Sequence, residues 1–446
     1  ETSDLVTEQG ILGRTERHIP LDRVQEISIE QGVLHRIFGV VDAKIETAGG
    51  QGAEATLSVL SRAEAERLRQ AVLARAAALK DPLVKKDALT KEAASEAELT
   101  PGPVTQPERR VIRRLSIGDL VVAGATSNHL LSALVLVGTL WAFVDDILPE
   151  SIYKRAADAV ADATGRLLEQ DAATAVLVTL VLVVLILAVS VLFSLIGSVA
   201  LFYGFTFSTT GEDLHRSYGL LTQRSSSLPR HRIQVLEIEQ KLLRRLFGLA
   251  TLRADTVGGH SDESEERNRG RDVLIPVVKR DEVEGLLPVF FPDLEPAPEA
   301  WQRVSPLAVR RGTFQGGVVC LLITVATLYY QGSAWGLWPL ALLPFIYWAN
   351  LVRYRNLGYW LGDRYFRTRR GWLGRSIHIV PIRKSQVVEI HQSIFDKRLG
   401  LASLIVDTAG QAFTGGGPQI TNLPVDEAYQ VARTLARRAA ATEYKL

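Results

Sequence analysis

The chain lacks methionine altogether and has a single cysteine, Cys320, among 446 residues. One cysteine excludes a disulfide framework and a thiolate metal cluster. The net charge is only +2, so no overall basic excess points to nucleic acid, and we expect no nucleic-acid partner. A natural reading frame begins with Met, so a chain that starts at Glu1 is expected to lack its natural N-terminus.

The usual catalytic motifs are also missing. The sequence has no phosphate-binding Gly-rich loop with Lys, no His-Glu-x-x-His and no nucleophile elbow. Of eight scattered histidines, only His129 lies in an apolar segment. A histidine in a membrane helix suggests a proton-linked role, but polar packing beside Ser127 and Asn128 explains it as well. We therefore expect no enzyme activity, no metal site and no cofactor.

One passage, clearest from Gly219 to Gly259, occurs three times and aligns without gaps on Pro20, Pro229 and Pro381. A glycine lies ten residues before each proline; glutamines follow at five and eleven, and glycines at nineteen and twenty-nine. The repeat anchors are Gly10, Pro20, Gln25, Gly39 and Gly49; Gly219, Pro229, Gln234, Gly248 and Gly258; and Gly371, Pro381, Gln386, Gly400 and Gly410. The period is far longer than a solenoid unit, so each copy is predicted to be a small domain.

Within each copy the pattern predicts short strands followed by one helix. In copy one, residues 24–31 and 40–47 are expected as strands, separated by a helical turn that Gly39 ends. Ser61 and Glu64 form a capping-box pattern at the start of an amphipathic helix. Copies two and three end likewise, at residues 279–290 and 425–440. We interpret the repeated glutamines, such as Gln25 and Gln31, as partners of buried backbone groups rather than ligand contacts.

Four apolar segments approach the length of about 20 residues that crosses a bilayer as a helix, at 120–144, 172–205, 313–330 and 335–352. Residues 175–193 are apolar on every face, which a soluble helix does not need. The last two segments are short, and the fourth carries Pro339 and Pro344, so buried core helices are the alternative there. The predicted organisation is a domain at 1–78, a linker at 79–115, a hairpin at 116–205, a domain at 206–291, a hinge at 292–312, a hairpin at 313–352 and a domain at 353–446.

Basic residues flank the domain-side ends of these segments, whereas the connection between the first two is mainly acidic. Lys and Arg mark the cytoplasmic side of membrane helices. We therefore expect all three repeated domains to face the cytoplasm.

The glycine turn, the Pro-x-x-x-x-Gln strand, the Arg/Lys-x-Phe/Leu-Gly turn and the Thr-Ala-Gly end resemble the bacterial pleckstrin-homology-like (PH-like) domain. In particular the chain is similar to YdbT-type membrane proteins, which carry three such domains separated by helical hairpins. Thr47-Ala48-Gly49 and Thr408-Ala409-Gly410 match that end, whereas copy two has Thr256-Val257-Gly258. The resemblance implies an α+β multidomain membrane protein of the bacterial inner membrane, a further hairpin ahead of Glu1, and no established biochemical activity.

Basic residues also recur three and sixteen positions after each repeat proline. They are Arg23, Arg232 and Lys384, then Arg36, Arg245 and Lys397, and a second cluster before the first span comprises Arg109, Arg110, Arg113 and Arg114. Near a cytoplasmic leaflet each exposed Lys or Arg gains about 1 kcal/mol from anionic lipid. These residues are candidate lipid or partner contacts, and the alternative is pairing with local acids such as Glu26 and Glu30.

These patterns favour an inner-membrane scaffold whose three domains bind protein partners, one another or a smaller PH-like membrane protein. Recognition of anionic lipid headgroups is the second hypothesis. Transport through the hairpins is the third, and it depends on His129 and Asn128.

Overall fold

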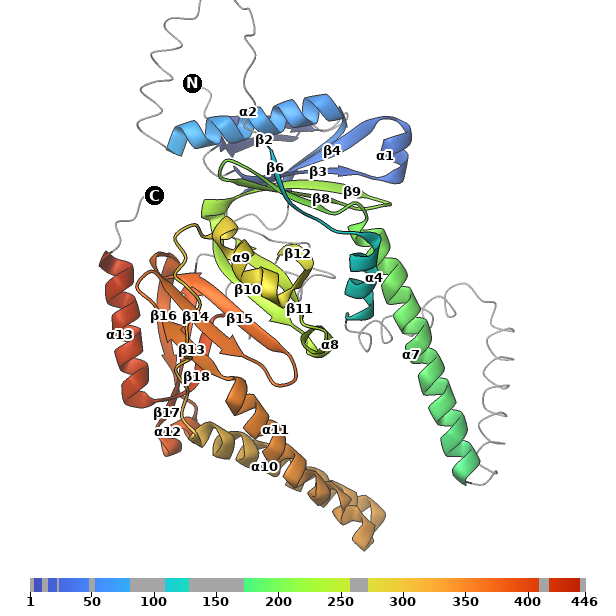
Figure 1. The fold of residues 1–446 in the computed structure, drawn as a ribbon, viewed down its shortest axis with the longest axis vertical. Helices are drawn as coiled ribbons and strands as arrows, with labels where there is room; N and C mark the ends of the chain where they lie inside the picture. Colours follow the sequence, from blue (N-terminus) through green and yellow to red (C-terminus); the bar gives the residue numbers. More distant parts are fainter. Residues whose placement is uncertain are drawn as a thin grey trace, which may run out of the picture. The chain divides into compact units, whose positions relative to one another are not determined.

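The computed structural model describes residues 4–9, 15–21, 24–47, 53–80, 109–127, 172–256, 272–408 and 417–441. The chain divides into two compact units. One unit comprises Glu1–Arg113, Thr206–Ser217 and Thr222–Leu446, and the other Arg114–Phe205 with Tyr218–Leu221. The first unit holds all three repeats and the second apolar hairpin, and the second unit holds the helices of the first hairpin (Figure 1).

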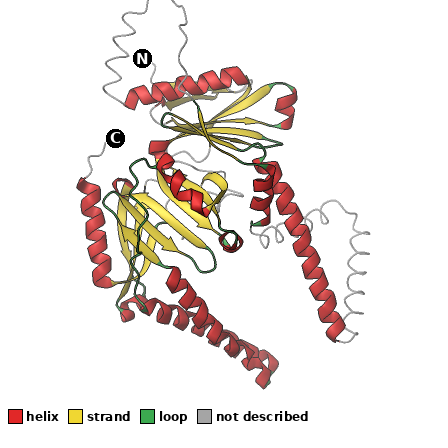
Figure 2. Cartoon of the chain, in the orientation of Figure 1, coloured by secondary structure: helices red, strands yellow, loops and turns green. Residues whose placement is uncertain are grey.

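Each repeat is built from strands and a C-terminal helix, as Figure 2 shows by colour. Copy one comprises β1 (Asp4–Gln9), β2 (Thr15–Pro20), β3 (Val24–Gln31), α1 (Val33–Ile37), β4 (Val40–Thr47), β5 (Ala53–Ser61) and α2 (Arg62–Lys80). Copy two comprises β7 (Thr206–Thr210), β8 (Asp213–Tyr218), β9 (Gln223–Pro229), β10 (Ile233–Gln240), α8 (Leu242–Leu246), β11 (Leu249–Thr256), β12 (Asp272–Lys279) and α9 (Arg280–Phe290). Copy three comprises β13 (Gly358–Leu361), β14 (Tyr365–Arg370), β15 (Arg375–Pro381), β16 (Ser385–His391), α12 (Ile394–Leu399), β17 (Leu401–Thr408), β18 (Gln419–Pro424) and α13 (Val425–Ala441).

The strands form four sheets, and the two inner sheets are each shared by neighbouring repeats. Their orders are β1-β2, β5-β4-β3-β9-β8-β7-β6, β12-β11-β10-β15-β14-β13 and β16-β17-β18. The last three strands of one repeat therefore continue edge to edge into the first strands of the next. The basic segment before the first span is itself a strand, β6 (Arg110–Arg114), beside β7.

Each core lies between the two sheets of one repeat and its terminal helix. In copy three, Phe366 and Val380 from the first sheet meet Leu404 from the second and Leu435 from α13 in one buried cluster. Copy one has an equivalent cluster that includes Ile19 from β2 and Ile27 from β3. The predicted capping box at the start of α2 is confirmed: Ser61 and Glu64 exchange hydrogen bonds of 3.1 and 3.2 Å.

The repeated glutamines have two distinct local roles. The register of the second sheet shifts between the fourth and sixth residue after each proline, so the first glutamine, at five, occupies a β-bulge in all three copies. The second glutamine donates its Nε2 to the backbone carbonyl of the residue that opens the next strand. These bonds join Gln31 to Val40 (3.0 Å), Gln240 to Leu249 (3.2 Å) and Gln392 to Leu401 (2.8 Å), which confirms the predicted backbone role.

The short helix after the bulged strand ends on a left-handed glycine in every copy. Gly39, Gly248 and Gly400 have φ values of 68°, 62° and 63°. Each donates its amide to the carbonyl three residues earlier, which turns the chain back into the sheet.

In the second unit, α4 (Ile117–Ala125) packs on α7 (Ala172–Phe202) through small residues. Ser194 and Ser198 of α7 donate to the carbonyls of Gly124 and Leu120 at 3.1 and 2.9 Å. A Cβ on Gly124 would come within 2.9 Å of the Leu195 Cα, so this close helix approach requires glycine. The rest of the predicted first span, including His129, lies outside the described residues.

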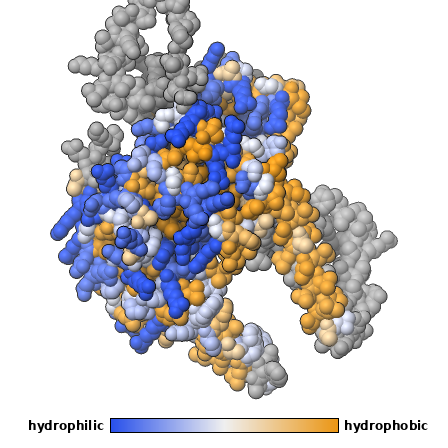
Figure 3. All heavy atoms as spheres, in the orientation of Figure 1, coloured by the Kyte–Doolittle hydropathy of each residue, from blue (hydrophilic) through white to orange (hydrophobic). Residues whose placement is uncertain are grey.

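The two arms of the second hairpin have different structures. The first arm, α10 (Leu307–Gln331), is one helix, but the second comprises a 3-10 segment, η3 (Ala334–Leu342), followed by α11 (Leu343–Asn356). Pro339 lacks an amide hydrogen and lies inside the 3-10 segment, where it disfavours a regular α-helix. Within the described residues, two helical stretches are long and apolar enough to cross a membrane, Val184–Phe202 and Leu307–Tyr330. Hydrophobic residues cover the surface of α7, whereas hydrophilic side chains dominate the sheet domains (Figure 3).

We predict that Gly248→Val lowers the free energy of unfolding by about 1–2 kcal/mol, because a β-branched residue is strained at positive φ. A Cβ at this position would meet nothing within 4 Å, so the cost is conformational and not steric crowding. Gly248→Asn is the control, since Asn tolerates the left-handed region. Thermal unfolding in detergent measures both variants, and equal loss in the two would contradict the conformational explanation.

Candidate interaction site at the junctions between repeats

Each inner sheet is completed by one antiparallel strand pair that joins two repeats. In the first junction Ile29, Glu30 and Gln31 of β3 face Ser225, Arg224 and Gln223 of β9. In the second, Ile238, Glu239 and Gln240 of β10 face Ile377, Ser376 and Arg375 of β15. Counted from the repeat prolines, both junctions pair the ninth residue after one proline with the fourth before the next. The chain therefore uses the same register twice.

A basic side chain reinforces each junction. Arg232 is buried and donates from Nη2 to the carbonyl of Val24 in copy one, at 2.6 Å. Lys384 occupies the same position in copy three and donates from Nζ to the carbonyl of Ile233 in copy two, also at 2.6 Å, as well as to that of His231. Burial, followed by the charge of Arg383, lowers the pKa of Lys384 to about 8. Two of the recurrent basic residues thus contact the backbone of the preceding repeat.

The junctions also contain contacts between polar side chains of neighbouring repeats. At the first, Arg224 lies 3.4 Å from Glu30, with both side chains partly in solvent, so the pair contributes little stability. At the second, His378 and Glu237 are both buried, with Nε2 to Oε1 at 3.4 Å. Removal of one member takes a hydrogen-bond partner from a buried polar group, which costs about 1–3 kcal/mol. The sequence analysis missed this pair, because Glu237 and His378 stand at different positions of the repeat.

His215 of β8 in copy two lies near Arg69 of α2 in copy one, so the charge of Arg69 acts on it across the first junction. Burial, then the charges of Arg69 and Arg109, lowers the pKa of His215 to about 4. The folded domain therefore keeps this imidazole neutral at a pH where it would ionise in the unfolded chain.

The remaining candidate basic residues occupy varied surroundings. Arg245 donates to the carbonyl of Leu373 across the second junction at 3.3 Å. Arg109 donates to Ser208 Oγ at 2.8 Å, and Arg113 forms an ion pair with Glu282. The exposed members are Arg36, Arg109, Arg110, Arg114 and Lys397. Arg23, Gly10, Gly49, Gly258, Gly410 and the Gln25 side chain lie outside the described residues.

The short helices after the bulged strands present apolar side chains to solvent. In α1 and the residue that follows it, Ile37 and Phe38 are 72 % and 75 % exposed, and Leu246 and Phe247 of copy two are 71 % and 67 % exposed. Figure 3 shows the hydrophobic patch over α1. In copy three the equivalent helix, α12, packs on α10, where the rings of Phe395 and Phe314 lie 6.0 Å apart. Arg311 of α10 also forms an ion pair with Asp396 of α12.

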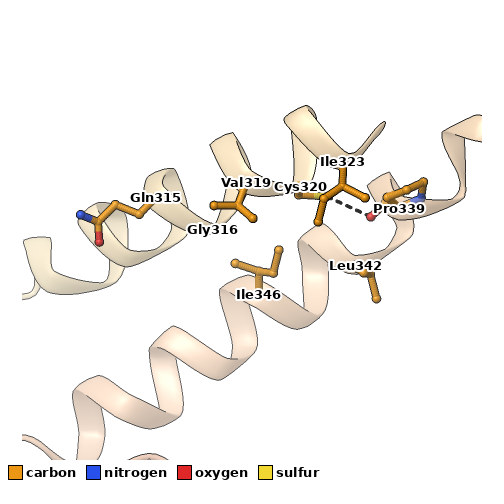
Figure 4. Close-up of a pocket in the computed structure, with 8 residues that line it drawn as sticks. All are labelled: Gln315, Gly316, Val319, Cys320, Ile323, Pro339, Leu342 and Ile346. Carbon is orange, nitrogen blue, oxygen red and sulfur yellow. Dashed lines mark hydrogen bonds between the residues drawn. The ribbon is translucent and has the colours of Figure 1, made fainter. Parts of the chain in front are cut away.

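An open apolar groove runs along the second hairpin, between α10 and the η3–α11 arm (Figure 4). Its lining includes Gly316, Ile323 and Ile346. Its polar features are the Gln315 side chain and a hydrogen bond from the Cys320 thiol to the Pro339 carbonyl at 3.0 Å. Such a surface suits lipid or helix contact and offers no charged group for catalysis. The described residues contain no cluster of His, Cys, Asp or Glu that could hold a metal ion.

The domains defined by these sheets match the Bacterial PH domain family at three places, residues 1–76, 157–287 and 313–439. The chain therefore belongs to the bacterial PH domain family, as an α+β multidomain protein with repeated PH-like domains.

The chain is also 28 % identical over 401 residues to the UPF0699 transmembrane protein YdbT of Bacillus subtilis strain 168. The alignment covers 89 % of this chain and 76 % of that relative. No solved structure matches the chain. The similarity to a transmembrane protein, together with the two membrane-length helices, supports membrane-integral character. This family is not a known enzyme family.

We predict that Lys384→Met destabilises the protein by about 1–3 kcal/mol, because two backbone carbonyls of copy two lose their donor. The mutated residue lies in copy three, yet amide hydrogen exchange should also rise in β10 of copy two. Lys397→Met removes an equal charge from the exposed α12 and should leave both quantities unchanged. If exchange rose only within copy three, the contact would not stabilise the junction.

We also predict that the folded state loses stability as the pH falls from about 6.5 towards 4. In that interval the unfolded chain binds a proton at His215 that the folded chain does not, so the free energy of unfolding decreases with falling pH. Replacement of His215 by Asn should flatten this dependence. Melting temperatures of both proteins, measured between about pH 7 and 5, test the assignment; parallel curves would contradict it.

Proposed function

We propose that the chain is a non-catalytic scaffold of the bacterial inner membrane. Its hairpins anchor it, and its three PH-like domains lie on the cytoplasmic side, where Arg residues flank the spans. The domains bind one another through shared sheets and bind a protein partner through the surfaces that remain open. A smaller PH-like membrane protein is one such partner.

The repeated junction carries this proposal. Two strand pairs in one register, each with a basic residue that donates to the preceding repeat, make the three domains a continuous array. Main-chain pairing at a sheet edge is a common way for one protein to recognise another.

Recognition of anionic lipid is the second candidate, favoured by the short helices α1 and α8. Each combines exposed apolar residues with a basic residue, Arg36 or Arg245. This combination suits the boundary between headgroups and acyl chains. In copy three the equivalent short helix, α12, packs directly on α10, which is long and apolar enough to cross a membrane.

Affinity purification of the full protein from its native membrane in mild detergent, followed by mass spectrometry of protein and lipid, separates the two candidates. The scaffold function predicts a stoichiometric protein partner that is retained by an Arg36→Glu/Lys397→Glu variant. Both residues are exposed, so these changes should not disturb folding. Enrichment of anionic lipid in the wild type alone, with no protein partner, would replace the scaffold function by lipid recognition.

A further inference from the structure

The third repeat lacks the neighbour that the first two have. Strand β16 is equivalent to β3 and β10, each of which pairs on one side with its own repeat and on the other with the next. In the described residues β16 pairs with β17 alone. In that part of the chain no strand pairs with its second edge, and α13 packs against β16.

Residues of β16 are more exposed than the residues of β10 at the same repeat positions, which a neighbouring repeat covers. Val235 of β10 is 1 % exposed and belongs to the core of copy three, so it fills a position in the following repeat. Its equivalent in β16, Val387, is 54 % exposed. Gln386 and Glu389 are exposed as well, whereas Gln234 and Glu237 at the same repeat positions are buried.

The complementary edge is present at the other end of the array. Strand β2 is equivalent to β9 and β15, which supply the pairing edge at the two junctions, but within the described residues β2 pairs with β1 alone. His18 of β2 is exposed, while Ser227 and Ile379 at the same position are fully buried. Among the described strands, the chain thus has one unpaired edge of each kind.

We propose that β16 pairs with β2 of a second copy of this chain, in the register that both internal junctions use. That register places Ile390 opposite Glu16 and Val388 opposite His18, as Ile238 lies opposite Ile377 and Leu236 opposite Ile379. Val387 then occupies the position in the second copy that Val235 occupies in copy three. The contact is heterologous, so copies join head to tail into a ring or a row. The inference rests on the scaffold function and names its partner as the chain itself.

Cysteine cross-linking in membranes tests this pairing. Replacement of Cys320 by Ala leaves a chain without cysteine, into which Glu16→Cys and Ile390→Cys are introduced in separate proteins that are then co-expressed. Mild oxidation should give a dimer on a non-reducing gel only when both variants are present. Co-expression of Glu16→Cys with Glu389→Cys is the off-register control, because adjacent residues of a strand point to opposite faces.

The double variant Ile29→Cys/Ser225→Cys is the positive control, since it places thiols at the same repeat positions across the first internal junction. It should form a link within one chain. If this control links while Glu16→Cys with Ile390→Cys does not, the proposal fails. It also fails if the off-register pair links equally well, or if Glu16→Cys and Ile390→Cys placed in one chain give only a link at monomer mass.

A second measurement does not depend on thiol geometry. Val387→Lys should shift the mass of the detergent-solubilised protein towards the monomer while the chain stays folded by circular dichroism, because Val387 is exposed in the single chain. Val111→Lys alters another exposed strand valine and should leave the mass unchanged. A wild-type protein that is monomeric at every concentration would overturn the inference. The purification described above could still find a different partner, so the two proposals can fail separately.

Discussion

Two antiparallel strand pairs, β3 with β9 and β10 with β15, hold the repeats together. Each pair makes one sheet out of parts of two repeats. Each junction lets one repeat contribute side chains to the core of the next, as Val235 of copy two does in the core of copy three. The stability of one repeat therefore depends on the next, which is the nearest-neighbour behaviour of repeat proteins.

The local devices that recur in sequence are those that shape this shared sheet. The first glutamine occupies a bulge, which bends a strand and increases its twist. The second glutamine donates a hydrogen bond to the carbonyl of the residue that opens the following strand. The left-handed glycine just before that residue ends the helical turn. Together they fix where the bulged strand begins and ends, and hence which residues reach the next repeat.

Much of a single repeat could be predicted from sequence, because its signals are local. The alternation over residues 24–31, the glycine stop at Gly39 and the capping box of Ser61 and Glu64 each act within a few residues. The sharing of sheets could not be predicted, because alternation gives the buried face of a strand but not its partner. The recurrence of Arg232 and Lys384 was visible, but a basic residue beside a membrane suggests lipid before it suggests a backbone carbonyl. Hydrophobicity alone also does not predict that the fourth apolar segment changes from a 3-10 segment, which contains Pro339, to an α-helix.

An array of this kind has ends that fit each other, whatever its number of repeats. Every internal junction uses one β16-type edge and one β2-type edge, so one of each always remains. Exposed strand edges invite uncontrolled pairing, and natural sheets protect them with charges. Glu16 places a carboxylate on β2, with Oε1 3.1 Å from His18 Nε2, but Val387 leaves an apolar side chain on β16. The edge at β2 therefore carries charge and the edge at β16 carries an apolar side chain. This combination favours a specific partner over indiscriminate aggregation, because only a strand that offers a matching pocket for Val387 gains by pairing with β16.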